Sequence, residues 1–317
     1  MKKVYITTNI PDVADELLKK HFKVCKNTEN KKLSKKELID IGNEYDALLT
    51  TLVNNIDKEV LSKSKKVKIY SNFAVGFNNF DMDYAKKNNI IITNTPGVLS
   101  DTTAETAWGL LFAVSRRILE ADSYLRSGKW ENFRPSLLLG KDIYNKKLGI
   151  IGAGRIGKRF AEKARGFHMD VMYHNRSRDF EFEKSFNANF ESLDDLLKKS
   201  DIISIHVPLT KETKYLIQKR ELELMKDDAI LINTSRGKVI NEKDLIDVLE
   251  NDKLFGAGLD VFENEPNVNQ RLIDLDNVVL TPHIGSASKE TREEMAKMAS
   301  KNIIEVLKGG KPLNPVY

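Results

Sequence analysis

The chain of 317 residues contains one cysteine, Cys25. A single thiol excludes an intrachain disulfide and a metal site built from several thiolates, and no other metal site is indicated. No apolar run reaches the roughly 20 residues of a transmembrane helix. The run after the basic start MKK is short and stops before Pro11, which fits a first β-strand better than a signal peptide. We therefore expect a cytoplasmic protein.

A concentrated basic tract is also lacking. The formal net charge is +5, from 51 Lys and Arg against 46 Asp and Glu, but the signs alternate, as in NEKDLIDVLENDK at 241–253. Such mixing is typical of a solvated surface. We expect neither nucleic acid nor a membrane as a partner.

What the chain does contain is two series of short strands that alternate with helical patterns, and its length also points to two domains. The first series of strands is KVYITT, KVC, ALLTT, VKIYSNF and IIITNT. The second, from about residue 147, is KLGIIG, DVMYHN, DIISIHVP, AILINTS, GAGLDVF and NVVLTP. This alternation predicts an α/β fold with parallel sheets and crossover helices.

Two further helices are predicted outside these series. Segment 100–128 opens with capping residues and becomes apolar at helical spacing, which predicts one long, mostly buried helix. Segment 291–310 predicts an amphipathic helix that ends at Gly309 and Gly310.

Three glycines form a G-x-G-x-x-G array in IIGAGRIGKRFA, at Gly152, Gly154 and Gly157. An apolar strand precedes the array and a helix begins inside it, as a dinucleotide-binding turn requires. Gly152 permits the tight turn, Gly154 lets the backbone approach a pyrophosphate, and Gly157 lets the helix pack closely. The alternative is a purely structural strand–turn–helix.

The next strand ends in YHNRSRD, residues 173–179, with Asn175 where an NAD site usually has a carboxylate. Arg176, Ser177 and Arg178 are donors suited to a 2′-phosphate. We therefore favour NADP(H) as cofactor, with NAD(H) also possible. Alternatively, the arginines lie in a solvated loop and Asp179 takes the ribose hydroxyl.

Arg236, Glu265 and His283 follow three successive strands of the second series, and the carboxyl ends of parallel strands line one crevice. Arg236 suits a substrate carboxylate and an adjacent carbonyl. His283 suits proton donation to an alkoxide, and Glu265 suits orienting a protonated ring. Each residue alone has a structural explanation, and only the three together indicate a catalytic site.

From about residue 45 onward, the sequence resembles the D-isomer-specific 2-hydroxyacid dehydrogenase family, most closely its glyoxylate/hydroxypyruvate reductases. The resemblance is carried by AVGFNNFDMDYA, NTPGVLSDTTAE, GIIGAGRIGKRFA, DIISIHVPLTKET, LINTSRGKVINEKDL, GAGLDVFENEP and LTPHIGSAS. It implies reduction of small 2-oxo acids to D-2-hydroxy acids by hydride transfer. It also implies a homodimer and two doubly wound domains: a Rossmann dinucleotide-binding domain at 99–285, inserted in a flavodoxin-like substrate domain at 1–98 and 286–317.

The resemblance also implies roles for individual residues. Arg236, Glu265 and His283 form the catalytic set, and Arg236 and His283 also contact the substrate. The residues implied to bind the substrate carboxylate are Leu52, Val75 and Gly76. The implied cofactor contacts beyond the glycines and residues 175–178 are Thr103, Arg155, Ile156, Val207, Pro208, Thr234 and Asp260.

The chain departs from the family pattern at Asn78, where many relatives carry Asp. Segment 124–145 resembles the family's dimer arm, but it offers Phe133, Leu137 and Leu138 where this branch often has a tryptophan. The four histidines that match no catalytic position are His21, His168, His174 and His206.

Two other functions remain open. A D-3-phosphoglycerate dehydrogenase needs cations for its substrate phosphate, and no arginine lies near LLTTLVNN or SNFAVGFNN; many such enzymes also carry a regulatory domain for which we see no room. A nucleotide-sensing corepressor of the same fold would assemble in response to ligand with negligible turnover.

Overall fold

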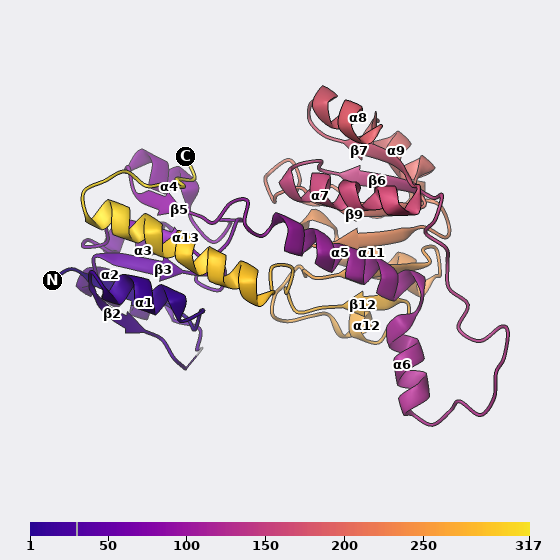
Figure 1. The fold of residues 1–317 in the computed structure, drawn as a ribbon, viewed down its shortest axis with the longest axis horizontal. Helices are drawn as coiled ribbons and strands as arrows, with labels where there is room; N and C mark the ends of the chain where they lie inside the picture. Colours follow the sequence, from indigo (N-terminus) through magenta and orange to yellow (C-terminus); the bar gives the residue numbers. More distant parts are fainter. Residues whose placement is uncertain (30) are drawn as a thin grey trace. The chain divides into compact units, whose positions relative to one another are not determined.

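A computed structural model describes residues 1–29 and 31–317 of the chain (Figure 1). The chain divides into two compact units, Met1–Leu99 with Ser286–Tyr317 and Ser100–Gly285. Each unit has its own fully parallel sheet, with five strands in the first and seven in the second. The predicted α/β fold with two doubly wound parallel sheets is confirmed.

The sheet of the first unit has the strand order β2-β1-β3-β4-β5, which is the flavodoxin-like order. Its strands are β1 (Lys3–Ile6), β2 (Lys23–Lys26), β3 (Ala47–Thr50), β4 (Ile69–Asn72) and β5 (Ile91–Thr93). Its helices are α1 (Val13–Lys19), α2 (Lys35–Glu44), α3 (Lys58–Lys63), α4 (Met82–Lys87) and α13 (Lys289–Leu307).

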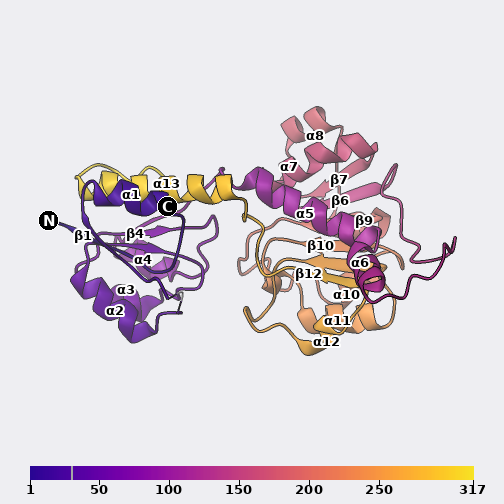
Figure 2. The same cartoon turned by 60° about the horizontal axis from the view of Figure 1, so that its bottom comes forward.

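Helices cover both faces of this sheet. Figure 2 shows α13 beside α1 on one face, with α2 and α3 on the other. Leu38 of α2, Leu61 of α3 and Ala85 of α4 share one buried cluster with Leu48 of β3. The C-terminal helix thus completes the core of the first unit, and Gly309, with a φ of +94°, follows its end.

The sheet of the second unit has the order β12-β11-β10-β9-β6-β7-β8, which is the Rossmann order extended by one strand. Its strands are β6 (Lys147–Ile151), β7 (Asp170–His174), β8 (Asn189–Phe190), β9 (Ile202–Ile205), β10 (Ile230–Asn233), β11 (Gly256–Leu259) and β12 (Val278–Leu280). Its helices are α5 (Ser100–Ser115), α6 (Ile118–Arg126), α7 (Arg155–Ala164), α8 (Phe180–Phe186), α9 (Leu193–Lys199), α10 (Lys219–Leu224), α11 (Glu242–Glu250) and α12 (Gln270–Ile273), with short 3-10 turns at Arg165–Phe167 and Gly237–Val239.

The prediction of one long buried helix over 100–128 is wrong. Arg117 has a φ of +51°, which breaks the segment into α5 and α6. α5 buries Trp108 and Leu111 in the core of the second unit, whereas α6 has no buried residue. Helical periodicity continues across the break, so the pattern alone does not reveal it. No helix in the described part of the chain is long and apolar enough to cross a membrane.

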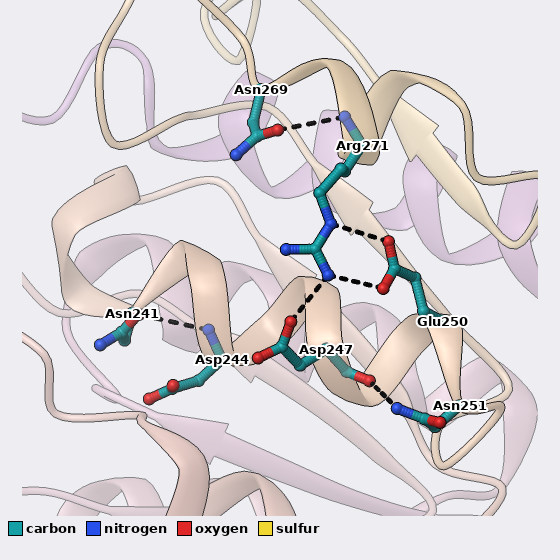
Figure 3. Close-up of polar contacts among 7 residues, drawn as sticks. All are labelled: Asn241, Asp244, Asp247, Glu250, Asn251, Asn269 and Arg271. Atoms are coloured by element: carbon teal, nitrogen blue, oxygen red, sulfur yellow. Dashed lines mark hydrogen bonds and ion pairs between the residues drawn. The ribbon is translucent and has the colours of Figure 1, made fainter.

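One arginine of α12 forms ion pairs with two carboxylates of α11 (Figure 3). Arg271 donates to both carboxylate oxygens of Glu250, at 2.9 and 2.6 Å, and to Asp247 at 2.8 Å. Asn241 and Asn269 accept from backbone amides at the starts of the two helices. These contacts fix the end of the connection that runs from β11 through Glu265 to α12.

Candidate active site

The glycine-rich turn joins β6 to α7. Gly152 has a φ of +97°, and a Cβ there would lie 2.7 Å from Val207 Cγ1. A Cβ on Gly157 would lie 2.3 Å from the Gly152 carbonyl oxygen, so close packing of α7 requires glycine. By contrast, no heavy atom among the described residues lies within 4 Å of a Cβ on Gly154. The turn therefore fits a dinucleotide pyrophosphate, which needs close backbone approach at a helix N-terminus.

Asn175 ties the end of β7 to this turn. Its Oδ1 accepts a 2.8 Å hydrogen bond from the Ala153 amide, a structural contact that the sequence reasoning missed. The next side chains, Arg176 and Ser177, are exposed. A hydrogen bond from Thr210 and, to a smaller extent, the charge of Arg176 lower the pKa of Glu212. The Arg176 guanidinium therefore lies within electrostatic reach of the loop after β9.

Arg178 and Asp179 are held by neighbouring helices. Arg178 donates from Nε and Nη2 to the two carboxylate oxygens of Glu183 in α8, at 3.0 and 2.6 Å. Asp179 accepts from the first turn of α8 as its N-cap and pairs with Lys158 of α7 at 2.6 Å. Arg176, in contrast, forms no ion pair within residues 1–29 and 31–317. The two arginines of the loop thus have different surroundings.

Glu265 and His283 meet from the loops after β11 and β12. The distance between His283 Nδ1 and Glu265 Oε2 is 2.8 Å, and Glu265 Oε1 accepts from the Phe262 amide at 3.1 Å. Burial acts to raise the pKa of Glu265, but the hydrogen bond and charge of His283, together with the Phe262 amide and the charge of Arg236, outweigh it and hold that pKa below its ordinary value. Because Nδ1 is engaged, Nε2 is the ring nitrogen left to face a substrate.

Arg236 lies in the loop after β10, close enough to Glu265 for each charge to affect the other's pKa. Burial lowers the pKa of Arg236, and Glu265 opposes this. The buried Asn233 donates to the Arg236 carbonyl at 3.1 Å. A Cβ on Gly237 would lie 2.0 Å from the Phe262 carbonyl carbon, so glycine lets this loop approach the loop of Glu265. The structure therefore brings together the three residues predicted as the catalytic set.

Asp260 braces the loop that carries His283. One carboxylate oxygen accepts from Thr281 Oγ1 and the Ile284 amide, and the other from the Gly285 amide, all at 2.7 Å. Burial raises the pKa of Asp260, and these three hydrogen bonds oppose the shift. The family resemblance implies a cofactor contact for Asp260, whereas this bracing of the His283 loop was not predicted. The sequence gives no sufficient signal of this bracing, because Asp260 precedes the loop of His283 by about two dozen residues and contacts it only in the folded chain.

The remaining predicted cofactor residues all belong to the second unit. Thr103 lies beside the loop that carries His283, since a Cβ on Gly285 would lie 3.3 Å from Thr103 Cγ2. Val207 contacts the glycine turn, and Thr234 is buried. Arg155 and Pro208 are exposed, and Ile156 is half-buried.

The other histidines have structural contacts. Burial lowers the pKa of His206 to about 3, and its Nε2 lies 2.9 Å from Ser204 Oγ. His174 Nδ1 lies 3.0 Å from the Glu191 carbonyl oxygen. His168 packs edge-on against Tyr144, and His21 is exposed.

The predicted carboxylate-binding residues belong to the first unit. Leu52 lies in the loop after β3, and Val75 and Gly76 lie in the loop after β4. β3 and β4 are neighbouring parallel strands, so both loops leave the same edge of the five-stranded sheet.

Residues 108–285 match the family model described as D-isomer specific 2-hydroxyacid dehydrogenase, NAD binding domain. The chain belongs to this family. It is 46% identical over 314 residues to a glyoxylate reductase from Thermococcus kodakarensis, covering 98% of this chain and 94% of the relative.

Solved structures agree with this membership of the 2-hydroxyacid dehydrogenases. The TT0316 protein from Thermus thermophilus matches with a TM-score of 0.92 at 39% identity, covering 99% of this chain and all of the other. An NADPH-dependent glyoxylate/hydroxypyruvate reductase from Sinorhizobium meliloti, in complex with NADP and malonate, matches with a TM-score of 0.89 at 28% identity, covering 99% and 96%. The predicted resemblance is confirmed, and this 2-hydroxyacid dehydrogenase is an NAD(P)-dependent oxidoreductase.

Proposed function

We propose that the protein reduces glyoxylate and hydroxypyruvate, the latter to the D-2-hydroxy acid, with His283 as proton donor. The observation that carries the proposal is the 2.8 Å contact between His283 and Glu265, with the charge of Arg236 nearby. A carboxylate on Nδ1 orients the ring and stabilises its protonated form. These are the groups that reduction of a carbonyl next to a carboxylate requires.

In this mechanism Arg236 binds the substrate carboxylate with parallel N–H donors and polarises the adjacent carbonyl. We assign further carboxylate contacts to the amides of Val75 and Gly76, beside Leu52. His283 donates the proton from Nε2 to the carbonyl oxygen as that oxygen gains charge, and Glu265 stabilises the ring. The bound nicotinamide cofactor supplies the hydride.

We assign the pyrophosphate of the cofactor to the turn Gly152–Gly157, with Arg155 and Ile156 over it. The other assigned contacts are Thr103, Val207, Pro208, Thr234 and Asp260. We also assign Asp260 a role in positioning His283. Its carboxylate accepts hydrogen bonds from the Ile284 and Gly285 amides, which directly follow His283 in the chain.

We further propose that NADPH is preferred over NADH. Asn175 brings no negative charge to the end of β7, and Arg176 with Ser177 presents exposed donors there. Asp179, the remaining candidate for a ribose hydroxyl, is engaged as a helix cap and by Lys158. The S. meliloti relative is described as NADPH-dependent, in keeping with this assignment.

A homodimer is also proposed. Exposed apolar side chains follow one another along α6 and the segment after it: Ile118, Leu119, Leu125, Trp130, Phe133 and Leu139. Exposed apolar surface of this kind marks interaction sites, and the segment includes the arm at 124–145. Light scattering after size exclusion tests this assignment, and a monomer would contradict it.

The function is tested by measuring kcat/KM for glyoxylate and hydroxypyruvate with NADPH and with NADH. We expect turnover of both acids and a higher value with NADPH, and chiral analysis of the hydroxypyruvate product should give the D form. Turnover that prefers NADH would contradict only the cofactor preference. Negligible turnover with nucleotide-linked assembly would instead favour a corepressor, and turnover limited to 3-phosphoglycerate would favour that dehydrogenase.

A further inference from the structure

In the loop after β4, the backbone carbonyls of three consecutive residues, Ala74, Val75 and Gly76, are held by hydrogen bonds. Each accepts a hydrogen bond from a residue at a strand end of the same five-stranded sheet. The pairs are the Thr95 amide with the Ala74 carbonyl at 2.9 Å, Asn94 Nδ2 with the Val75 carbonyl at 2.8 Å, and Asn72 Nδ2 with the Gly76 carbonyl at 2.9 Å. Three neighbouring peptide planes are therefore fixed in orientation.

Fixing a carbonyl also fixes the next amide. A trans peptide is planar, and its C=O and N–H point in opposite directions. The bond to the Ala74 carbonyl thus points the Val75 N–H away from Thr95, and the bond to the Val75 carbonyl points the Gly76 N–H away from Asn94. Neither amide has an acceptor among residues 1–29 and 31–317, and both residues are half-exposed. Two N–H groups side by side can bind the two oxygens of a carboxylate.

The two asparagines are themselves anchored. Asn72 is fully buried, and its Oδ1 accepts from Thr50 Oγ1 at 3.1 Å. Asn94 is 9% exposed, and its backbone amide donates to the Asn314 carbonyl at 3.2 Å. A buried, bonded side chain has few alternative rotamers, so the loop geometry is set before any substrate arrives.

We propose that Asn94 and Asn72 are positioning residues for the carboxylate-binding amides of Val75 and Gly76. This inference rests on the proposed function, because it takes the carboxylate of the 2-oxo acid as the ligand. Asn94 acts most directly, since its partner carbonyl shares a peptide plane with the Gly76 amide. Both asparagines act through the loop carbonyls to which their Nδ2 atoms donate.

The test uses Asn94→Leu, which keeps the branched shape of the side chain but removes the donor without adding charge. Asn27→Leu is the matched control. Asn27 is also 9% exposed, and its Nδ2 donates to the Thr7 and Lys31 carbonyls at 3.1 and 2.8 Å. It follows β2, at the opposite edge of the sheet from β5.

Binding of oxamate, an unreactive mimic of glyoxylate, is measured by calorimetry with NADPH saturating, alongside KM and kcat for glyoxylate. We expect Asn94→Leu to weaken oxamate binding and raise KM by about ten-fold, the loss of one hydrogen bond to a charged group. kcat should change less, and the Kd for NADPH should not change. Asn27→Leu should lower the melting temperature without changing oxamate affinity. Asn94→Ala replaces the leucine variant if that protein does not fold.

Each outcome decides the inference separately from the function. Equal oxamate affinity in wild type and Asn94→Leu would overturn it, and so would wild-type protein that does not bind oxamate. Equal losses in the Asn94 and Asn27 variants would also overturn it, since they would reflect general destabilisation. If oxamate binds and depends on Asn94, but no 2-oxo acid is reduced, the positioning role stands and the proposed reaction fails.

Discussion

The imidazole of His283 and the carboxylate of Glu265 share a 2.8 Å contact between Nδ1 and Oε2, although 18 residues separate them in the chain. Each residue of the pair is also held by a further hydrogen-bonding contact. The Phe262 amide donates to Glu265, and Asp260 holds the backbone on the C-terminal side of His283. The pair is therefore set in the folded chain, and its chemistry can be tested one residue at a time.

Replacing Glu265 with Gln should lower kcat about 10²-fold, because the ring loses the charge that stabilises its protonated form. The shape of the side chain is kept, so the Kd for NADPH should stay the same. Glu263→Gln is the control, because Glu263 lies in the same loop but accepts from Tyr215 and the Glu242 amide instead. Similar kinetics for both variants would remove Glu265 from the catalytic set.

The same substitution should change the pH dependence of stability. The folded-state pKa of Glu265 lies below its ordinary value, so the ionised carboxylate stabilises the fold at neutral pH. This contribution is lost as the pH falls through the lowered pKa. The melting temperature of the wild type should exceed that of Glu265→Gln near pH 7, and the difference should shrink on acidification. A difference that grows toward acid pH would contradict the assigned direction.

Replacing His283 with Gln should lower kcat for glyoxylate at least 10²-fold, because no group then donates a proton from the position of Nε2. The measurement is kcat, with a deuterated cofactor to show that hydride transfer limits the rate. Wild-type kcat in His283→Gln under hydride-limited conditions would exclude His283 as the acid.

Much of the fold and site follows from local sequence patterns. β-branched strands alternating with helices lead to parallel sheets, and the carboxyl ends of neighbouring strands bring Glu265 and His283 together. The break at Arg117 could not be found in this way, because residues after it continue a helical apolar pattern. Their exposure depends on what lies beside α6, which periodicity does not encode.

After β7, two elements of secondary structure were missing from the prediction. Neither α8 nor the two-residue strand β8 was predicted, since FEFEKSFNANF follows a loop interpreted as a phosphate site. Asp179 as a cap, with Phe182 and Phe186 one turn apart, was an available signal for α8. That helix would have placed Glu183 within reach of Arg178. The bracing by Asp260 and Asn94 depends on tertiary contacts and had no local signal.

Replacing Arg236 with Lys should lower kcat/KM for glyoxylate by about 10- to 100-fold, because an ammonium group cannot reproduce a two-donor contact with a carboxylate. Arg271→Lys is the control: Arg271 makes a two-donor contact with Glu250 on the surface of α11 (Figure 3). That variant should keep wild-type kinetics. Wild-type activity in Arg236→Lys would reject the assigned role.

The two arginines after β7 should differ in cofactor selection. Arg176→Ala should raise the Kd for NADPH at least ten-fold and leave the Kd for NADH unchanged, because only NADPH carries the 2′-phosphate. Arg178 already donates twice to Glu183, so Arg178→Ala should lower the melting temperature and change both Kd values by a similar, smaller factor. Fluorescence titration with each nucleotide measures these constants. A selective loss of NADPH binding in Arg178→Ala alone would reverse the assignment and mean that Arg178 leaves Glu183 for the phosphate.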